Sequence, residues 1–452
     1  MKGSITIFLA FSLSVLTGFI LLLTGTAIRN AEKIRLEGTM DLGMNSILGE
    51  FHVGLHDRYG LLYIDLSYEG KTPSIHNAES RLEFYIRQNT EETDFGPWGS
   101  VSVEDVTVSQ VKSAAFGYGN SMKYQAVCFM QDSGCQGKIH GEAFTAVLPF
   151  SGRDAMAEWS TLMGQIDDME LPKLINENGK PQEVLLGNPA DVIYALSGND
   201  LLYLTGIDIS GVGVGRIAPD GYASARDLQN ISYGETKEAD TEVFIAYLFE
   251  KMGNYRYTRE DSFLQYQLEY VAEGKASDYE NLQAVTEKLL QWCFAKNVEY
   301  VMTNDALYGE ALAIADSLQA VSLKQAFREP VAKSLLYAVA YLESLSEVRC
   351  LMKGGRIAMS MDSFFSDMKH VLTANIIEIP SEEGGYCYEE YLFAMILQLS
   401  EKERNLRSMD IMEMDIRMIS NNPLFSMDFC VERLEAKLIS GSLFLERVYG
   451  YY

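Results

Sequence analysis

The chain opens with a long apolar segment. No charged residue occurs from Ile5 to Ile28. As an α-helix this run would be about 36 Å long, slightly more than a bilayer hydrocarbon core of about 30 Å. A cleaved secretory signal is the rival interpretation, with Lys2 before the run and small residues at 25–27, but the apolar part of such signals is shorter, about 7 to 15 residues. The pattern predicts one transmembrane helix that contacts the lipid bilayer through residues 5–28.

Helical periodicity continues past the apolar run. Apolar or small residues recur at the three-and-four spacing of an amphipathic helix, at Ala31, Ile34, Gly38 and Leu42, and then at Met44, Leu48, Phe51 and Leu55. We therefore expect one stem helix that ends near Asp57. Its apolar stripe should lie on a sheet that begins with the strand-like run at 60–66.

Later patterns alternate between strand and helix. Val101–Val103 and Val106–Val108 alternate with a phase shift, which predicts a bulged strand or two short strands. Residues 191–204 have a helical pattern, and helical stripes dominate from about 235. Pro330 suits the first turn of a further helix that ends at Gly354. Two later stripes predict helices around 388–399 and 409–419, and residues 442–449 predict a closing strand.

These elements predict an α+β fold with a long N-terminal transmembrane and amphipathic stem helix and a mixed α/β head that includes a helical bundle section. A length of 452 residues is more than one hydrophobic core usually serves. We divide the chain into a stem at 1–57, an α/β head region at 58–235, a helical bundle region at 236–329 and a C-terminal α+β region at 330–452.

The charge balance is strongly acidic. Asp and Glu number 63 against 37 Lys and Arg, a net charge of −26. Such a surface repels phosphate backbones, so we expect no nucleic-acid partner. Charges near the membrane segment are asymmetric, because Arg29, Lys33 and Arg35 follow the run and only Lys2 and the amino terminus precede it. The positive-inside rule alone would favour a cytoplasmic body.

Six cysteines are scattered without a CxxC pair or the His spacing of a zinc site. Only Cys128 and Cys135 are close in sequence. In an oxidising compartment they could close a small disulfide loop. Elsewhere cysteines commonly serve as small buried apolar residues.

Three groups of residues could carry chemistry, and each has a simpler interpretation. His52, His56 and Asp57 could face one metal from a helix, but exposed helix surface accounts for them equally well. Gly211–Gly215 has the pattern GxGxG, which lacks the third glycine and the GK[ST] ending of phosphate loops and indicates a turn. Two carboxylate groups could support acid–base chemistry, namely Asp167, Asp168 and Glu170, and Asp410, Glu413 and Asp415.

For the second carboxylate group we favour a structural role. Glu413 and Arg417 are spaced as a surface ion pair on a helix. No GxSxG motif occurs, and no papain-like cysteine signature is present. We therefore expect no catalytic residues, no metal ligands, no cofactor and no enzymatic activity.

The N-terminal residues Lys2–Ala10 resemble the start of TadE and TadF minor pseudopilins of tight-adherence (Tad/Flp) pili, which begin with a basic residue, Gly and an apolar helix. The stretches 40–46, 58–65, 385–391 and 407–413 are similar to an uncharacterised Gram-positive family with this stem and a larger head. The resemblance implies a body outside the cytoplasm and prepilin-type cleavage after Gly3, which would leave Ser4 as the new terminus. Counting from Ser4, the fifth residue is Phe8, where major pilins have a Glu, so one strong reason to pack inside a filament is missing.

The resulting hypothesis is a membrane-anchored, extracytoplasmic structural or interaction protein at the cell surface, a minor-pseudopilin-like component associated with a tight-adherence pilus. Its expected partners are the bilayer, pilus or pseudopilus subunits and a prepilin peptidase. An alternative is a membrane-tethered binding protein or adhesin that enters no pilus. An anchored enzyme is the third hypothesis.

Overall fold

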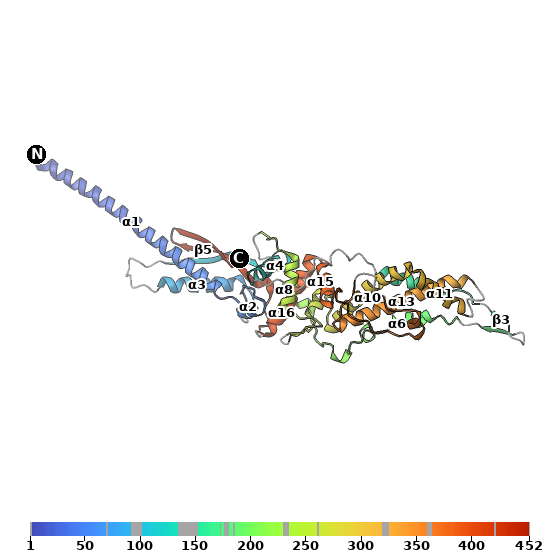
Figure 1. Cartoon of the computed structure of the whole chain (residues 1–452). Helices are drawn as coiled ribbons and strands as arrows, with labels where there is room; N and C mark the ends of the chain where they lie inside the picture. The colour runs from blue at the N-terminus through green and yellow to red at the C-terminus, as the bar shows by residue number, and fades with distance from the viewer. Residues whose placement is uncertain are drawn as a thin grey trace. The chain divides into compact units, whose positions relative to one another are not determined.

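A computed structural model describes residues 2–68, 71–91, 102–133, 152–171, 173–175, 180–183, 186–228, 235–259, 262–318, 325–358, 364–419 and 422–451. The fold is α+β, as predicted, with a long apolar N-terminal helix and a small antiparallel sheet (Figure 1). The chain forms two compact units that interleave in sequence. Unit 1 comprises 1–136, 219–240 and 405–452, and unit 2 comprises 137–218 and 241–404. The four predicted regions follow chain order instead.

Unit 1 combines the stem helix with a four-stranded antiparallel sheet. Its helices are α1 (Lys2–Leu48), α2 (Val53–Tyr59), α3 (Ile75–Glu91), α4 (Phe116–Asp132) and the part of α16 (Glu401–Ile419) from Asn405 onward. Its strands are β1 (Ile64–Asp65), β2 (Asp105–Ser113), β5 (Cys430–Ser440) and β6 (Leu443–Gly450). Strand β5 is central and pairs with β2 along one edge. Along its other edge β5 pairs first with β1 and, farther along the strand, with β6.

The second half of α1 packs on α3 and on the sheet. Leu36, Met40, Met44 and Ile47 are fully buried and join the inward residues of β2 and β5 in one core. Gly43 lets α3 approach closely, because a Cβ there would lie 3.0 Å from Ile86 Cγ1. This core fixes the stem to the sheet.

The predicted stem differs from the structure in two ways. Helix α1 ends at Leu48 and not near Asp57, because Phe51 pairs with Ile64 and the His52 N–H donates to the Tyr63 carbonyl at 2.8 Å, which requires extended backbone. The first part of the predicted stripe was also wrong in phase, since Ile34 and Leu42 are 69% and 57% exposed, whereas Met44 and Leu55 of the second part are buried as expected.

Other predicted elements were confirmed with changed bounds. The strand expected at 60–66 is the short β1, and the strand expected at Val106–Val108 is β2, whose register shifts lie after Val108 and after Lys112. Val103 precedes β2, and Val101 lies outside the described residues. The helix expected at 191–204 is divided into α6 (Pro189–Leu196) and α7 (Leu201–Leu204), because Asp200 caps the start of α7. The closing strand is β6, and the central strand β5 was missed.

Unit 2 is mainly helical and centres on α13 (Arg328–Met352), which is buried along most of its length. The other helices are α5 (Gly152–Asp167), α6, α7, α8 (Thr241–Lys251), α9 (Gln267–Glu273), α10 (Asp278–Thr303), α11 (Asp305–Ser317), α14 (Met368–Thr373) and α15 (Tyr388–Leu397). Strands β3 (Lys173–Ile175) and β4 (Pro181–Glu183) form a separate antiparallel pair. Trp159 of α5 is fully buried among Phe294, Tyr337 and Tyr341, which places the core between α5, α10 and α13.

Candidate functional site

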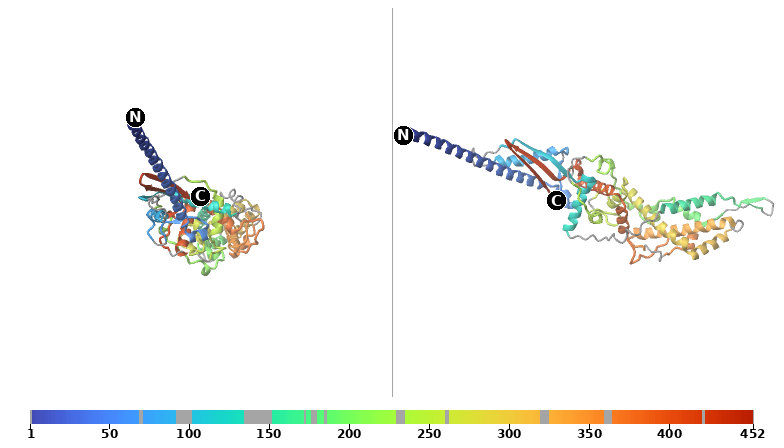
Figure 2. Two further views of the ribbon diagram at one scale, coloured as in Figure 1. Left: turned by 90° about the vertical axis from the view of Figure 1, so that its left-hand side faces the viewer. Right: turned by 90° about the horizontal axis from the view of Figure 1, so that it is seen from above.

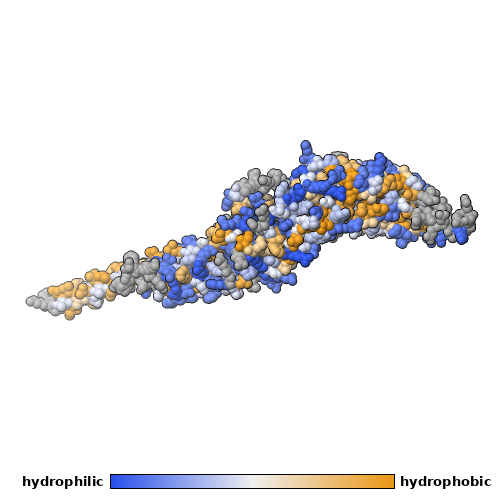
Figure 3. Space-filling model, turned by 90° about the horizontal axis from the view of Figure 1, so that it is seen from below, coloured by the Kyte–Doolittle hydropathy of each residue, from blue (hydrophilic) through white to orange (hydrophobic). Residues whose placement is uncertain are grey.

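The most distinctive surface of unit 1 is the N-terminal half of α1. Among the described residues, one helix is long and apolar enough to span a membrane, and it covers Ile5–Leu48. Its most apolar stretch has a mean hydropathy of 2.4, and none of that stretch is buried. Phe8, Phe11 and Phe19 are 60–72% exposed. A second view shows this half of the helix standing clear of the sheet (Figure 2), and a space-filling view shows it as a mostly apolar rod (Figure 3).

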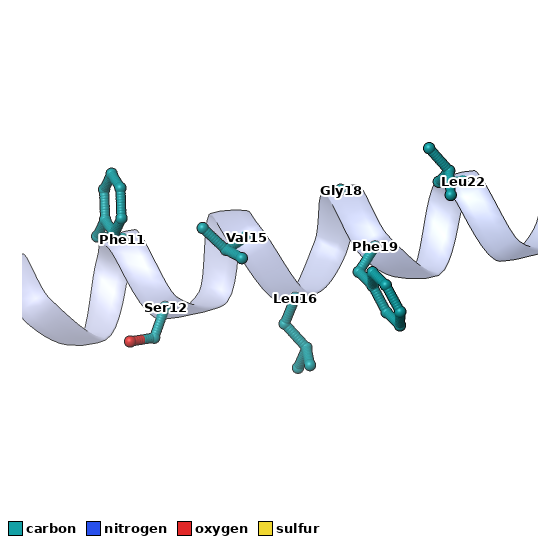
Figure 4. Close-up of a pocket in the computed structure, with 7 residues that line it drawn as sticks. All are labelled: Phe11, Ser12, Val15, Leu16, Gly18, Phe19 and Leu22. Atoms are coloured by element: carbon teal, nitrogen blue, oxygen red, sulfur yellow. The ribbon is translucent and has the colours of Figure 1, made fainter.

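A shallow hollow of about 580 Å³ on this helix is bordered by residues of α1 alone. Phe11 and Leu22 project from one side of the helix, and Leu16 and Phe19 project from the opposite side (Figure 4). Residues of a single helix cannot enclose a ligand. The hollow is therefore part of a surface that suits lipid or another helix.

Three threonine hydroxyls in the apolar half are satisfied within the helix. The hydroxyls of Thr17, Thr24 and Thr26 each donate a 2.8 Å hydrogen bond to the carbonyl four residues earlier. A hydroxyl without a partner is costly in hydrocarbon. These bonds make the threonines compatible with a bilayer.

The carboxylates Asp410, Glu413 and Asp415 all lie on α16, and all three are fully buried. Arg226 forms a bidentate contact with Glu413, at 2.5 and 2.9 Å, and a second contact with Asp428. Arg417 also donates to Glu413, at 3.2 Å. The predicted pairing of Glu413 with Arg417 is present, but its predicted surface location was wrong, because the carboxylate is the centre of a buried network.

Burial and ion pairing act in opposite directions in this network. Burial raises the pKa of Glu413, and the two guanidinium groups oppose that shift. Burial alone would also raise the pKa of Asp428, but hydrogen bonds from Arg226 and Ser426 outweigh it and hold that pKa below its usual value. A carboxylate whose oxygens are occupied by guanidinium groups is a poor general base. We interpret the network as structural.

Arg226 was missed by the sequence analysis. It lies in the segment 219–228, which belongs to unit 1 although the residues before and after this part of the sequence, 137–218 and 241–404, belong to unit 2. The segment is held to α16 by the Ser224 N–H, which donates to Asp410 at 2.8 Å, and by Arg417, which donates to the Gly221 carbonyl at 3.1 Å. No local spacing could have linked it to α16.

The histidine pair does not face one metal from a single helix. His52 is the N-cap of α2, and its Nδ1 accepts the Leu55 N–H at 3.0 Å. His56 lies within α2 with Asp57 3.4 Å from its Nδ1. Among the described residues, no group of three or more His, Cys, Asp or Glu side chains is placed to hold a metal ion.

A groove of about 600 Å³ lies beside these histidines in unit 1. It has a mixed polar and apolar lining made by Glu50, Phe51, His52, Val53, Gly54, Asp65, Tyr68, Lys71, Arg81 and Ile419. Two of its charges are paired with each other, because Arg81 contacts Glu50 and the Tyr85 hydroxyl donates to the same carboxylate at 2.5 Å. The Glu50 carboxylate is thus occupied by partners within the protein.

The glycine loop of unit 2 has a packing role. A Cβ at Gly213 would lie 2.5 Å from Asp278 Oδ2, and a Cβ at Gly215 would lie 2.3 Å from the Phe263 carbonyl oxygen. The Asp278 carboxylate accepts backbone N–H groups of Gln265 and Tyr266 at 3.1 and 3.0 Å. A carboxylate packed against the loop would repel a phosphate.

The remaining predicted residues are scattered. Asp167, Asp168 and Glu170 are exposed near the end of α5. The five described cysteines form no disulfide with one another, and Cys135 lies outside the described residues, so its pairing with Cys128 stays a prediction. Gly3 and Ser4 lie in the first turn of α1.

The fold and surface together define a class of protein, one with an N-terminal helix apolar enough to span a membrane and an α+β head. Residues 178–441, more than half of the chain, match a family of unknown function, DUF5702, and the chain belongs to this family. Neither a curated protein nor a solved structure matches the chain.

Proposed function

We propose that the chain is a single-pass membrane protein whose head lies outside the cytoplasm and serves as a structural component, similar to a minor pseudopilin, of a tight-adherence pilus or related assembly. Two features support the proposal, namely the resemblance at Lys2–Ala10 and the division of α1 into an apolar half and a half that packs on the sheet. The proposal includes contacts with pilus subunits and a prepilin peptidase.

The two halves of α1 carry this proposal. The stretch Ile5–Ile28 is apolar and uncharged and its large side chains are exposed, while Leu36, Met40 and Met44 in the second half are fully buried against α3 and the sheet. A helix built in this way can place the sheet of unit 1 at a membrane surface without a flexible linker between them. This suits an assembly component, because that sheet is packed directly on the helix that meets lipid or neighbouring subunits.

The polar interior of unit 1 supports a structural role over an enzymatic one. Glu413 and Asp415 are buried in ion pairs with Arg226, Arg417 and Arg58, and these contacts hold α2, α16 and the segment 219–228 together. Their charges are used for folding and not directed into a cavity. We accordingly propose no reaction for this chain.

The mass of the mature N-terminal peptide tests the pilin-like part of the proposal. Protein from native membranes should begin at Ser4 in cells that contain a prepilin peptidase, and Gly3→Val should prevent this cut. Gly25→Val is the matched control, because it changes a glycine of the same helix away from the cleavage position. An intact Met1 in the unchanged protein would contradict processing, and a start near Ile28 would contradict the membrane anchor.

Orientation and assembly need a separate measurement. Protease added to intact cells should digest the head if it lies outside the cytoplasm, whereas a protected head would agree with the charges of Arg29 and Lys33 and overturn this part of the proposal. Crosslinking in those cells should then join the head to pilus subunits. Repeated absence of such adducts, with the head digested, would instead support a tethered binding protein.

The tethered binding protein is the second candidate because unit 2 exposes large apolar residues on α7 and on two other segments. Tyr203, Val214 and Phe263 are 71%, 93% and 51% exposed. Exposed apolar side chains often mark interaction sites. In this case their replacement with Ser should abolish adhesion and leave the cleavage at Gly3 unchanged.

A further inference from the structure

The turn between β5 and β6 presents two apolar side chains to solvent. Ile439 and Phe444 are directly paired across the hairpin, and they are 37% and 58% exposed. Gly441 makes the turn with a φ of 54°. Phe444 and Ile439 lie on the sheet face opposite Leu438 and Leu445, which are buried. The pair is therefore exposed on the outer face of the sheet.

Contacts with α1 give the direction of this hairpin. Arg447 of β6 lies 3.1 Å from Asp41 and 3.6 Å from Glu37 of α1. Four residues later, the Tyr451 hydroxyl donates to the Leu48 carbonyl at 2.5 Å. The later residue of β6 thus contacts the later residue of α1, so β6 runs in the same direction as α1. The β5–β6 turn, which precedes β6, therefore points back toward the apolar half of the helix. Figures 1 and 2 show the hairpin lying along α1 in this sense.

The same contacts give the height of Phe444 along the stem. Phe444 precedes Arg447 by three residues, about 10 Å of strand, which corresponds to about seven residues of helix. This places Phe444 beside roughly residues 30–34 of α1, just beyond the end of the apolar segment at Ile28. The polar headgroup layer extends about 5 to 7 Å beyond the hydrocarbon core. An exposed phenylalanine ring at this height can reach that layer.

The stem carries matching side chains at this level. Arg29 and Lys33 are exposed on α1, and Ile34 is 69% exposed. Cationic side chains and aromatic rings are typical of the boundary between lipid and water. The hairpin turn thus adds an aromatic and an aliphatic side chain to a boundary that the helix already marks.

We propose that the β5–β6 turn is a second membrane contact, in which Phe444 and Ile439 lie in the headgroup layer of the leaflet that α1 enters. The inference rests on the proposed membrane span of α1. Two separated contacts restrict rotation of the stem about its own axis, so the sheet of unit 1 presents one fixed side to neighbouring subunits. The Glu104 carboxylate accepts the Gly441 N–H at 3.1 Å and so helps to hold the turn.

Photocrosslinking of the full chain in phosphatidylcholine nanodiscs tests this contact. A benzophenone amino acid replaces Phe444 in one variant and Val448 in another, because Val448 lies on the same face of β6, is 43% exposed and is about 13 Å farther from the bilayer. Lipid adducts at position 444 should exceed those at 448 by roughly fivefold, given the thin headgroup layer. Equal yields, or adducts only with protein, would overturn the inference.

A third variant separates this inference from the membrane span itself. The benzophenone replaces Phe11, which is 70% exposed in the apolar half of α1. Lipid adducts at position 11 without adducts at 444 would retain the span and reject the hairpin contact. Absence of adducts at both positions would reject the span as well.

Discussion

The Tyr59 hydroxyl donates a 2.7 Å hydrogen bond to Asp415 Oδ2, although the two residues are 356 positions apart in the sequence. Arg58 reaches the same carboxylate oxygen at 2.8 Å. Tyr59 and Asp415 are fully buried, and burial together with the Asp415 charge raises the pKa of Tyr59 far above its usual value. The contact joins α2, next to the stem, to α16 at the other end of the sequence.

Replacement of this carboxylate should destabilise unit 1. Asp415→Ala removes a buried partner of Arg58 and Tyr59, which typically costs about 3 to 5 kcal/mol. Tyr59→Phe leaves the pairing of Asp415 with Arg58 and should cost about 1.5 kcal/mol. For a unit of this size, the melting temperature should fall by about 2 to 4 °C for each kcal/mol. Calorimetry of the solubilised chain measures both variants, with Tyr203→Phe at an exposed position as the control. Equal effects of Asp415→Ala and Tyr203→Phe would contradict the structural role.

Arg226 should be the most sensitive cation of the head. Arg226→Ala removes the bidentate partner of the buried Glu413 and the partner of Asp428, so we expect a loss of about 3 to 5 kcal/mol. Arg226→Lys keeps a charge but cannot reproduce the planar fork, and should recover only part of the loss. Thermal unfolding followed by circular dichroism gives the comparison.

The control for Arg226 is another arginine pair at the surface. Arg328 contacts Asp316 at 2.6 Å, but the two side chains are 37% and 52% exposed. Exposed pairs of this kind contribute about 0 to 1 kcal/mol. Arg328→Ala should therefore change the melting temperature little, and a loss as large as that of Arg226→Ala would show that burial does not decide the effect.

Glu269 should make the stability of unit 2 depend on pH. Burial raises its pKa from 4.5 to about 7, while the Tyr388 hydroxyl and the Tyr255 N–H, which donate to Oε1 at 2.6 and 2.8 Å, limit the shift. The folded state thus holds a proton that the unfolded state releases between pH 4.5 and 7. Stability from this group is present below pH 4.5 and is lost as pH rises to about 7, by up to about 3 kcal/mol.

Glu269→Gln should remove this dependence. The amide oxygen can still accept both hydrogen bonds, and the amide has no charge to bury, so the variant should be more stable than the unchanged chain at pH 8 and similar at pH 4.5. Melting temperatures at the two pH values test this, with the exposed Glu310→Gln as the control. If Glu269→Gln lowers the melting temperature at pH 8, the assignment is wrong.

The glycine loop offers a sharp comparison within one motif. Gly215→Ala places a Cβ against the Phe263 carbonyl oxygen and should cost more than the 1 to 3 kcal/mol of ordinary overpacking, because backbone must move. At Gly211 the nearest atom would be 4.0 Å away, so Gly211→Ala should be tolerated. Urea unfolding of the two variants distinguishes this packing role from a ligand-binding loop, for which both variants would fold alike.

Features with a local cause could be predicted from the sequence. The apolar run at 5–28 is long, uncharged and continuous, and the later helical stripes have the period of an amphipathic helix. The central strand β5 was missed even though Leu434, Ala436 and Leu438 alternate, because charged residues separate them and mask the pattern of a strand buried on one face. The signal was present but weak.

Burial of the charged network could not be predicted in this way. Glu413 and Arg417 have the spacing of a surface pair, and only the approach of Arg226, 187 residues away, turns that side of α16 into an interior. The phase of the stem failed for the same reason. Leu42 fits a helical stripe as well as Met40 does, and the position of α3 decides which of them is buried.

The membrane role of α1 should depend on its central apolar residues. Leu16 and Phe19 lie near the middle of 5–28 and are 56% and 60% exposed, so replacing both with Arg should not disturb the head. Each Arg at the centre of a span costs about 2.5 to 3.5 kcal/mol on insertion scales. The double variant should shift from the carbonate-resistant membrane pellet to the soluble fraction, while Ile34→Arg with Leu42→Arg, at exposed positions beyond the span, should stay in the pellet. If carbonate extracts the unchanged chain as well, α1 does not cross the bilayer, and the helix would have to serve as a contact surface for protein.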